Sequence, residues 1–409
     1  MTFVPEVIAV DYETALTSGV PSTEYYRDDF RAISAAFAWR GQGGEMRSLF
    51  LEGEDEIRVF LERIKASGAR VVVHNFQFEH GVSLYRFPGF EACITHDTMR
   101  LAQVADNGGK LAAYQPQVLT YDDMLDALEG GGPKPHSTGL ALVAATSRWL
   151  PEEWRDHKAP FHTWLREHAG VKKGQEGQHL TALPPDMLEA YNVADAKVTL
   201  LLYETFVAEF TRFGYDYTLD HELYKSTARM VSKAKGVGAA VDVTALQAYV
   251  TQVEAEVAAI EQRFRDRFQA EIAQLEAMAH RAYVRAVKTT KAQDRRAAEE
   301  PERFNVGSNK QLKALFVDML GIAPKFWTKE PKAKPGKARK QEFVPSPSFK
   351  SAHLGTYGEG GELLRTRRKR MLVLQQARAL LKLAAYDGRW HFDLRACGTA
   401  TGRMAGGRA

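Results

Sequence analysis

Residues 7–14 read VIAVDYET, and this stretch decides how the N-terminal part of the chain is interpreted. Four apolar residues followed by acids are typical of a buried strand that ends at a polar edge. Asp11 and Glu13 lie two residues apart, so a strand places both carboxylates on the same face. Adjacent carboxylates repel each other unless a cation neutralises them, and Mg²⁺ prefers oxygen ligands of this kind. A solvated strand end is the alternative for so short a pattern.

The flanking sequence predicts an α/β fold with a mixed sheet covered by helices. Two further strands, an amphipathic helix and another buried strand follow the first strand in that order. Asp97 is predicted to cap a later helix. Two prolines at positions 184 and 185 begin a helix that we expect to end at a boundary near residues 212–214. The predicted strands are residues 33–39, 46–51 and 71–73, and the predicted amphipathic helix is residues 54–67.

Two further polar patterns follow the acidic strand. In VVVHNFQFEHG, residues 71–81, an extended backbone would place Asn75, Gln77 and Glu79 on one side, where the amides could contact nucleic acid. The alternative is a helix that starts here, with Glu79 near its N-terminal dipole. Tyr191 and Asp195 are four residues apart on the predicted helix and share a face. A phenol there could orient a metal-held water, and a surface Tyr–Asp pair is the alternative.

Taken together, D-x-E, N-x-x-x-E and Y-x-x-x-D in this order resemble the exonuclease motifs of the DEDD superfamily, in its tyrosine branch. The resemblance implies a ribonuclease H-like mixed sheet flanked by helices and a 3′→5′ exonuclease. It also implies that Asp11, Glu13, Glu79 and Asp195 hold two divalent ions, Mg²⁺ or Mn²⁺, and that Tyr191 helps to position the attacking water. The superfamily usually has Asp where this chain has Glu79. Catalysis is sensitive to placement on a scale of about 1 Å, so the extra methylene puts the level of activity in question.

The second half of the chain predicts long helices. Asp242 is expected to cap the first of them. Its apolar residues are spaced alternately by four and three, which is a heptad seam, and we expect it to pack against residues 363–386 as a coiled coil. The same helix is expected to continue, less regularly, towards Glu300. Residues 328–348, rich in Pro and Lys, are expected to be mobile. The seam consists of Leu246, Val250, Val253, Val257, Ile260 and Phe264.

Three segments in this half resemble family A (polymerase I-like) DNA polymerases of the bacteriophage type. FNVGSNKQLKALFVDMLGI (residues 304–322) and KGVGAAVDVTAL (residues 235–246) are similar to parts of the family's thumb, and RACGTATGRM (residues 395–404) is similar to the hairpin where the palm begins. The resemblance implies that Arg403, Ser308 and Lys310 contact DNA. A helix N-cap at Ser308 and a plain β-hairpin with its turn near Gly398 are the alternatives.

The resemblance implies three regions along the chain. They are a 3′→5′ exonuclease domain at residues 1–212, a mainly helical thumb with a long antiparallel helix pair at residues 213–389, and the start of the palm hairpin at residues 390–409. No residues follow Ala409, so we expect the palm and fingers to be absent from this chain. The implied function is proofreading during DNA replication, with a single-stranded 3′ end and a primer–template duplex as partners. A subunit of a split polymerase, completed by a second chain, and a catalytically weak DNA-binding module are the alternatives.

Composition and charge agree with a soluble DNA-binding protein. A length of 409 residues suits two or three domains. Residues 325–409 carry 19 Lys and Arg against 6 Asp and Glu, which leaves the first 324 residues with a net charge of −9 within a total of +4. This asymmetry favours a polyanionic partner for the C-terminal part, and a solvated lysine tract is the alternative. Two distant cysteines, no signal peptide and no apolar run long enough for a membrane span predict a cytoplasmic protein, in the host cytoplasm if phage-encoded.

Overall fold

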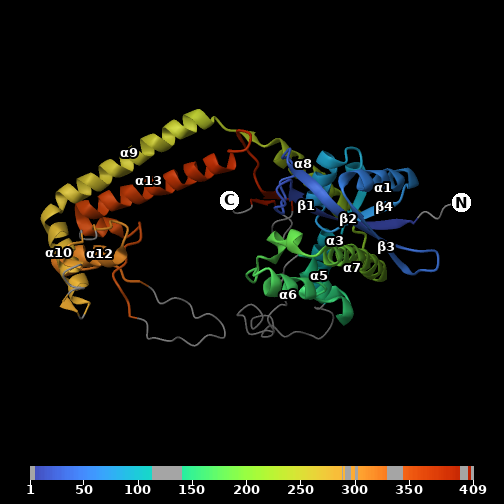
Figure 1. Ribbon diagram of the computed structural model, residues 1–409, viewed down its shortest axis with the longest axis horizontal. Helices are drawn as coiled ribbons and strands as arrows, with labels where there is room; N and C mark the ends of the chain where they lie inside the picture. Colours follow the sequence, from blue (N-terminus) through green and yellow to red (C-terminus); the bar gives the residue numbers. More distant parts are fainter. Residues whose placement is uncertain are drawn as a thin grey trace. The chain divides into compact units, whose positions relative to one another are not determined.

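The computed structural model describes residues 5–112, 141–287, 289–290, 296–299, 303–328, 344–396 and 404–406. The chain forms two compact units (Figure 1). Unit 1 consists of Met1–Ala239 and His391–Ala409, and unit 2 consists of Ala240–Trp390. None of the helices in the described ranges is both long and apolar enough to cross a membrane.

Unit 1 is built on a five-stranded mixed sheet in the order β3-β2-β1-β4-β5. The strands β1 and β2, and β2 and β3, pair antiparallel, whereas β1, β4 and β5 run parallel. The predicted succession of three strands, a helix and a strand is confirmed. The elements are β1 (Val7–Leu16), β2 (Phe30–Arg40), β3 (Met46–Glu52), α1 (Glu54–Ser67), β4 (Arg70–Val73) and β5 (Ile94–Asp97).

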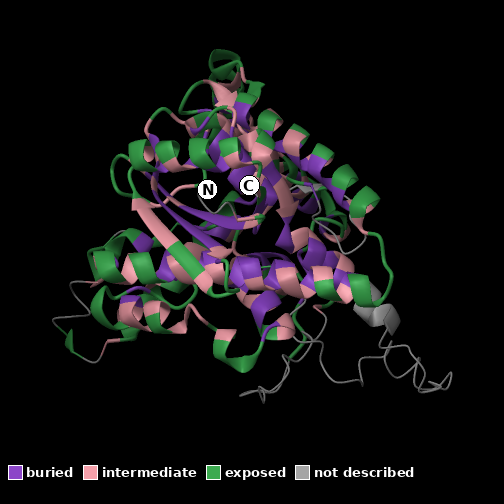
Figure 2. Ribbon diagram, turned by 90° about the vertical axis from the view of Figure 1, so that its right-hand side faces the viewer, coloured by how far each residue is buried: buried purple, intermediate pink, exposed green. Residues whose placement is uncertain are grey.

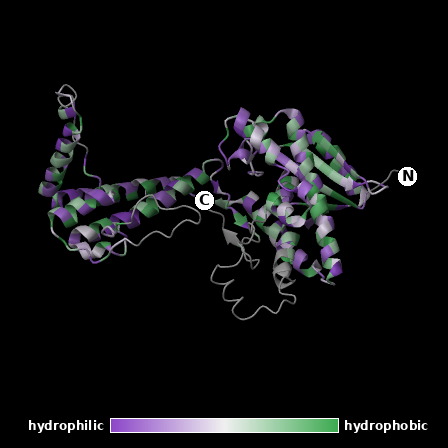
Figure 3. Cartoon of the chain, turned by 90° about the horizontal axis from the view of Figure 1, so that it is seen from below, coloured by the Kyte–Doolittle hydropathy of each residue, from purple (hydrophilic) through white to green (hydrophobic). Residues whose placement is uncertain are grey.

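Helices cover both faces of this sheet, and most residues of β1, β2 and β4 are buried (Figure 2). One face, including Val10, Tyr12 and Phe37, packs against α1 (Glu54–Ser67), α2 (Phe76–Arg86) and α8 (Thr218–Val237). The other face packs against α3 (Thr98–Ala112), α5 (Leu142–Trp149) and α7 (Pro185–Arg212). The short helix α6 (Ala159–His168) precedes α7 along the chain. Figure 3 shows the hydrophobic character of the strands that these helices cover.

Small side chains bring α7 close to the sheet. Ala9, Ala36 and Ala38 on the strands meet Ala196 of the helix in one buried cluster. Alanine has no side-chain atoms beyond Cβ, so the helix backbone can approach the strands closely. The helix starts at Pro185, as the two prolines predict, and ends at Arg212. Because β1 places Asp11 and Glu13 on the face of Ala9, both acids point towards α7.

The extended interpretation of residues 75–79 was wrong, because α2 begins at Phe76. Asn75 precedes it with a left-handed backbone, φ 76°. The Asp97 carboxylate accepts hydrogen bonds from the backbone N–H groups of Asn75 and Phe76, and also from that of Met99 at the start of α3. The predicted helix cap at Asp97 is therefore confirmed, and this one buried carboxylate caps two helices. The exposed N–H groups of a helix start favour such an acceptor.

The end of the chain returns to unit 1. Ala396 is 4% exposed and belongs to the core cluster beneath β1. The ring of His391 stacks on that of Tyr26, with centroids 3.5 Å apart. Antiparallel pairing of β8 (Leu394–Arg395) with β9 (Ala405–Gly406) agrees with the predicted hairpin. Gly398 and Arg403, predicted for its turn and for DNA contact, lie outside the described residues.

The boundary between the compact units falls after Ala239, whereas the sequence placed it near residues 212–214. The helix α7 does end at Arg212, but α8 follows it and packs against α2. Tyr224 and Ala228 of α8 are buried in the same core cluster as β1. This burial of apolar surface joins α8 to unit 1. The two-residue strand β6 (Ala239–Ala240) lies at the junction.

Unit 2 is mainly helical, and its longest elements are α9 (Val243–Arg267) and α13 (Gly358–Leu383). Asp242 caps α9, since its carboxylate accepts a hydrogen bond of 2.9 Å from the backbone N–H of Ala245. Val250, Val253 and Val257 of the predicted seam are buried together with Leu374 and Ala377 of α13, which confirms the predicted partner. The pair is antiparallel, because the ion pairs Glu254–Arg378, Glu256–Arg370 and Glu261–Arg367 run in opposite directions along the two helices.

The expectation that α9 continues towards Glu300 was wrong. It ends at Arg267, and after Phe268 a separate helix, α10 (Gln269–Arg285), begins. The side chains of Phe264 and Phe268 are buried in a second apolar cluster with Phe304 and Phe316. Burial of these rings favours the end of α9 at this point. Residues 304–322 form that cluster through α12 (Asn309–Lys313) and a π-helical turn, Ala314–Met319. The short strand β7 (Arg389–Trp390) ends the unit.

Most of the predicted basic segment, residues 329–343, lies outside the described residues. The described ends of the segment meet. The backbone N–H of Thr328 donates to the carbonyl of Ser346, and Trp327 forms an isolated bridge with Pro347. Residues 325–328 and 344–348 are therefore paired in unit 2.

Candidate metal centre

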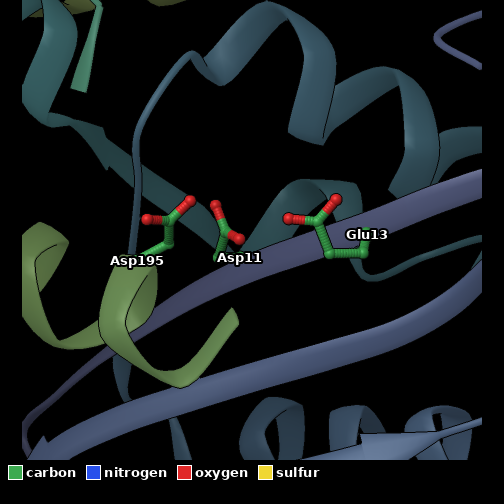
Figure 4. A group of neighbouring side chains, drawn as sticks. All are labelled: Asp11, Glu13 and Asp195. Atoms are coloured by element: carbon green, nitrogen blue, oxygen red, sulfur yellow. The ribbon is translucent and has the colours of Figure 1, made fainter. Parts of the chain in front are cut away.

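Asp11, Glu13 and Asp195 meet above the middle of the sheet (Figure 4). One carboxylate oxygen from each lies within 4.8 Å of the others. The first two come from β1 and the third from α7, so residues some 180 positions apart converge. The register of β1 against β2 shifts between Glu13 and Thr14. Such a bulge bends a strand and redirects the side chains beside it, and here it follows directly after Glu13.

Asn192 holds Asp11 in place. Its side-chain amide donates to the Asp11 carboxylate at 2.7 Å and to the Asp11 carbonyl at 3.2 Å. The hydroxyl of Ser34 donates to the amide oxygen of Asn192 at 3.1 Å, which fixes the orientation of the amide. Asn192 is fully buried. Sequence reasoning missed it, although it lies three residues before Asp195 on the same helix and so faces the same way.

Glu79 lies close to this group but outside the 4.8 Å cluster. It projects from α2 and is 2% exposed. Its Oε2 is buried and has no hydrogen-bond partner among the described residues. Burial raises the pKa of Glu79 well above its usual range, and the nearby charges of Asp11 and Glu13 raise it further. A buried carboxylate oxygen without a hydrogen-bond donor destabilises the folded chain. A bound cation would neutralise the ionised carboxylate and remove this cost.

Tyr191 and Asp195 are both buried, so they are not a surface pair. Two residues that no sequence pattern singled out, His157 and Lys158, contact them. The imidazole Nε2 of His157 lies 2.7 Å from one Asp195 oxygen, and the Lys158 ammonium donates to the other. Lys158 also donates to the Tyr191 hydroxyl at 2.7 Å.

A strained turn delivers His157 and Lys158 to these acceptors. Asp156, directly before them, has a left-handed backbone with φ 51°. That conformation is uncommon for residues other than glycine. Residues held in such conformations cluster at binding sites, where the surrounding structure stabilises them. The helix α6 then begins at Ala159. No spacing pattern links these residues to the three motifs, so only the folded chain reveals them.

The charges divide the cluster into two parts. Burial, together with the charge of Asp195, raises the pKa of Asp11 well above its usual range and that of Glu13 to about 8. Burial also acts to raise the pKa of Asp195, but Lys158 and then His157 outweigh it and leave that pKa below the usual value. Lys158 also acts on Asp11 and Glu13, but burial and the neighbouring acids outweigh it there, whereas Asp195 on α7 forms ion pairs with Lys158 and His157.

This donor set fits a hard divalent cation. The three groups of this cluster are all carboxylates, the ligand type that Mg²⁺ and Mn²⁺ prefer. The orphaned oxygen of Glu79 and the raised pKa of Glu13 both indicate negative charge that a bound cation would offset. Asp11, Glu13 and Asp195 are the residues that could hold an ion together, with Glu79 available at the side.

The residues predicted to contact DNA lie in different places. The amide of Gln77 is engaged at both ends, since its nitrogen donates to the Leu394 carbonyl at 2.6 Å and its oxygen accepts from the Ala396 N–H at 3.1 Å. It therefore fastens the returning C-terminal segment to α2. In unit 2, Ser308 caps α12 as the alternative interpretation had it, and Lys310 is exposed on that helix.

Much of the positive charge on α13 is paired within unit 2. Arg367, Arg370 and Arg378 form ion pairs with glutamates of α9, and Arg365 pairs with a glutamate one turn away. Lys369 of the same helix is exposed. The net charge of this region consequently overstates the number of cations available to a polyanion.

No protein-family model matches the chain, and no curated protein matches it. Among solved structures it is similar to the POL domain of Pol1 from M. smegmatis in complex with DNA primer–template and dNTP. The fold is similar to part of a DNA polymerase. The TM-score is 0.54 at 14% sequence identity, over 98% of this chain. The chain spans about half the length of that structure, 51%.

Proposed function

We propose that unit 1 is a 3′→5′ exonuclease and that unit 2 is the DNA-binding thumb of a family A DNA polymerase. Together they would remove misincorporated nucleotides from a primer end. The observation that carries the proposal is the meeting of Asp11, Glu13 and Asp195 beside the orphaned oxygen of Glu79. The mixed sheet with helices on both faces supports the ribonuclease H-like part of the proposal, and the polymerase-like fold supports the thumb.

The three acids would hold divalent cations, with Glu79 as a further ligand. Such ions make a water more acidic and neutralise charge on a phosphate under attack. The protein groups around them have separate tasks. Asn192 keeps Asp11 oriented, and the Tyr191 hydroxyl, which accepts from Lys158, stands next to Asp195 to orient a water. The product would be a nucleoside monophosphate released from a 3′ end.

DNA would reach this site as a frayed single strand from a primer–template duplex. Lys310 and Lys369 are exposed cations of unit 2 that could contact phosphates, and Ser308 could do so beside its cap. Phosphate contacts release counterions, so the affinity for primer–template DNA should fall steeply with salt. A flat salt response would remove the reason for assigning unit 2 to DNA.

The test is degradation of a 5′-labelled DNA strand with a 3′ mismatch in the presence of Mg²⁺ or Mn²⁺. The native chain should give a ladder that shortens from the 3′ end. Asp195→Ala should lower the rate by at least about a hundredfold, because it removes a ligand from the centre. Asp186→Ala, which changes an exposed acid in the first turn of the same helix, should leave the rate within about twofold. Equal rates for all three proteins would refute the exonuclease.

One observation favours a second candidate, a DNA-binding module with little catalysis. Glu79 stands where the superfamily usually has Asp, and it lies outside the 4.8 Å cluster. Glu79→Asp separates the two candidates. If the longer side chain misplaces a ligand, the substitution should raise the rate above that of the native chain. If the native chain degrades DNA and Glu79→Asp degrades it more slowly, the carboxylate of Glu79 is correctly placed for catalysis. That result would refute the candidate of a DNA-binding module with little catalysis.

The likeness to only 51% of the polymerase structure raises the question of the palm and fingers. We propose that a polymerase function, if this protein has one, uses further residues, including a second chain in the split-subunit alternative. Co-purification of the chain from its native source with a palm-containing protein would support a split polymerase. A native complex without such a protein would argue against it.

A further inference from the structure

Lys158 already forms an ion pair with Asp195, one of the acids of the proposed metal centre. Its ammonium donates to Oδ2 of Asp195, while His157 Nε2 lies 2.7 Å from Oδ1. Both oxygens of this carboxylate therefore already have partners. By contrast, one oxygen of Glu79 has none among the described residues. The proposed metal centre thus contains one ligand that is already neutralised by a positively charged side chain of the same protein.

Several contacts hold the side chain of Lys158 in this position. The lysine is largely buried, and its ammonium also donates to the Tyr191 hydroxyl at 2.7 Å. The same nitrogen lies 4.6 Å from the centre of the Tyr191 ring, within the range of a cation–π contact. Three contacts with two residues of the site hold this lysine, which follows the left-handed Asp156 by two residues. A flexible surface lysine would lose too much side-chain entropy to be held in this way.

We propose that Lys158 is an internal competitor of the divalent cation, which has to displace the ammonium from Asp195 to bind there. This inference rests on the proposed exonuclease function and specifies how its site is loaded. Two positive charges cannot share one carboxylate oxygen in a buried site without strong repulsion. The displaced ammonium needs a new anionic partner, and a phosphate of the 3′-terminal nucleotide is the anion that the proposed substrate supplies. Metal and substrate would consequently assist each other's binding.

The experiment measures Mn²⁺ binding to the full chain in the absence of DNA, by calorimetry and by the electron paramagnetic resonance of free Mn²⁺. Lys158→Met removes the competing charge and should tighten Mn²⁺ binding by at least about tenfold. Lys172→Met is the matched control, because it removes an exposed lysine of the same unit, and should change the affinity by less than about twofold. Lys158→Arg keeps the charge and should stay close to the native affinity.

Lys158→Gln guards against misfolding, since an amide can still donate to Asp195 without a charge, and it should also tighten Mn²⁺ binding. A second arm adds thymidine 5′-monophosphate. The nucleotide should increase the Mn²⁺ affinity of the native chain more than that of Lys158→Met, because only the native lysine needs a new partner.

The outcomes separate the inference from the proposed function. If Mn²⁺ binds the native chain, is lost in Asp11→Ala, and binds Lys158→Met and Lys158→Gln no more tightly, competition is refuted while the metal centre stands. Weaker binding by both variants would likewise refute it and would make Lys158 a positioning residue. If Mn²⁺ does not bind in a way that depends on Asp11, the proposed metal centre fails, and the inference fails with it.

Discussion

Glu13 and its neighbours make the stability of the metal-free chain depend on pH. Burial, with the charge of Asp195, raises the pKa of Glu13 from 4.5 to about 8, and burial shifts the pKa values of Asp11 and Glu79 in the same direction. The folded chain therefore keeps a proton that the unfolded chain has lost, so stability falls as the pH rises from about 4.5 to about 8. The pKa of Asp195 is lowered from 3.8, so this residue changes the stability only at about pH 4 and below.

Buried histidines oppose this trend only at lower pH. Burial lowers the pKa of His80 and His96 to about 4 and that of His221 to about 3, from 6.5. In the unfolded chain about half of these histidine protons are still bound at pH 6.5 and about one tenth at pH 7.5, so the carboxylates dominate the slope only between about pH 7.5 and 8. In EDTA the melting temperature should fall across this window, and Glu13→Gln should flatten the slope. Mn²⁺ should raise the melting temperature more at pH 8 than at pH 6.5, because fewer protons compete. A slope that is unchanged in Glu13→Gln would contradict the assignment.

At the scale of residues, spacing within one element was predictable and convergence between elements was not. Asp11 and Glu13 share a strand face and Tyr191 and Asp195 share a helix face, and both relations follow from local geometry. A turn that contains the left-handed residue Asp156 places Lys158 beside Asp195. Such a turn has no periodic sequence pattern from which it could be predicted. The assignment of Glu79 as a metal ligand stays a prediction.

At the scale of elements, the seam between α9 and α13 should stabilise unit 2 more than the ion pairs beside it. Val253 is fully buried against α13, and Val253→Ala should lower the free energy of unfolding by about 2 kcal/mol, through lost burial and a cavity. Glu254 and Arg378 are both about half exposed, so Glu254→Gln should change the free energy of unfolding by less than about 1 kcal/mol.

Denaturant unfolding of these two variants and the native chain measures the difference in unit 2. An effect of Glu254→Gln equal to that of Val253→Ala would show that the ion pairs, rather than the apolar seam, hold the helices together. Comparison at low and high salt gives a second check, because screening weakens the contribution of an exposed ion pair and leaves burial of apolar surface intact.

The elements that were predicted correctly are those with a long, regular pattern. The heptad seam of α9 extends over six apolar positions and identified both the helix and its partner. The pattern at residues 75–79 spans only a few residues, and apolar and polar side chains alternate there although the backbone is helical. A distant carboxylate, Asp97, determines where α2 starts, and tertiary contacts of this kind override a short local pattern.

At the scale of the whole molecule, the chain leaves unit 1 after Ala239 and returns to it at His391. Sequence reasoning assigned residues 390–409 to a third region, because a two-residue strand pair gives no sign of where it will pack. The returning segment nevertheless contributes Ala396 to the core of unit 1. Gln77, two residues from Glu79 on α2, binds the same segment through both ends of its amide. The end of the chain therefore supports the helix that carries a candidate ligand.

A chain that ends at Trp390 should consequently have a less stable unit 1. It loses two hydrogen bonds to Gln77 and the burial of Ala396, which together contribute about 2–4 kcal/mol. Thermal unfolding and amide hydrogen exchange in α2 would measure the loss, and a chain ending at Ala396 is the control that keeps these contacts. The proposed exonuclease activity should decrease in the shorter chain and persist in the longer one, because the position of α2 determines that of Glu79. Equal melting temperatures and equal protection of α2 in the two truncated chains would show that residues 391–396 do not support this helix.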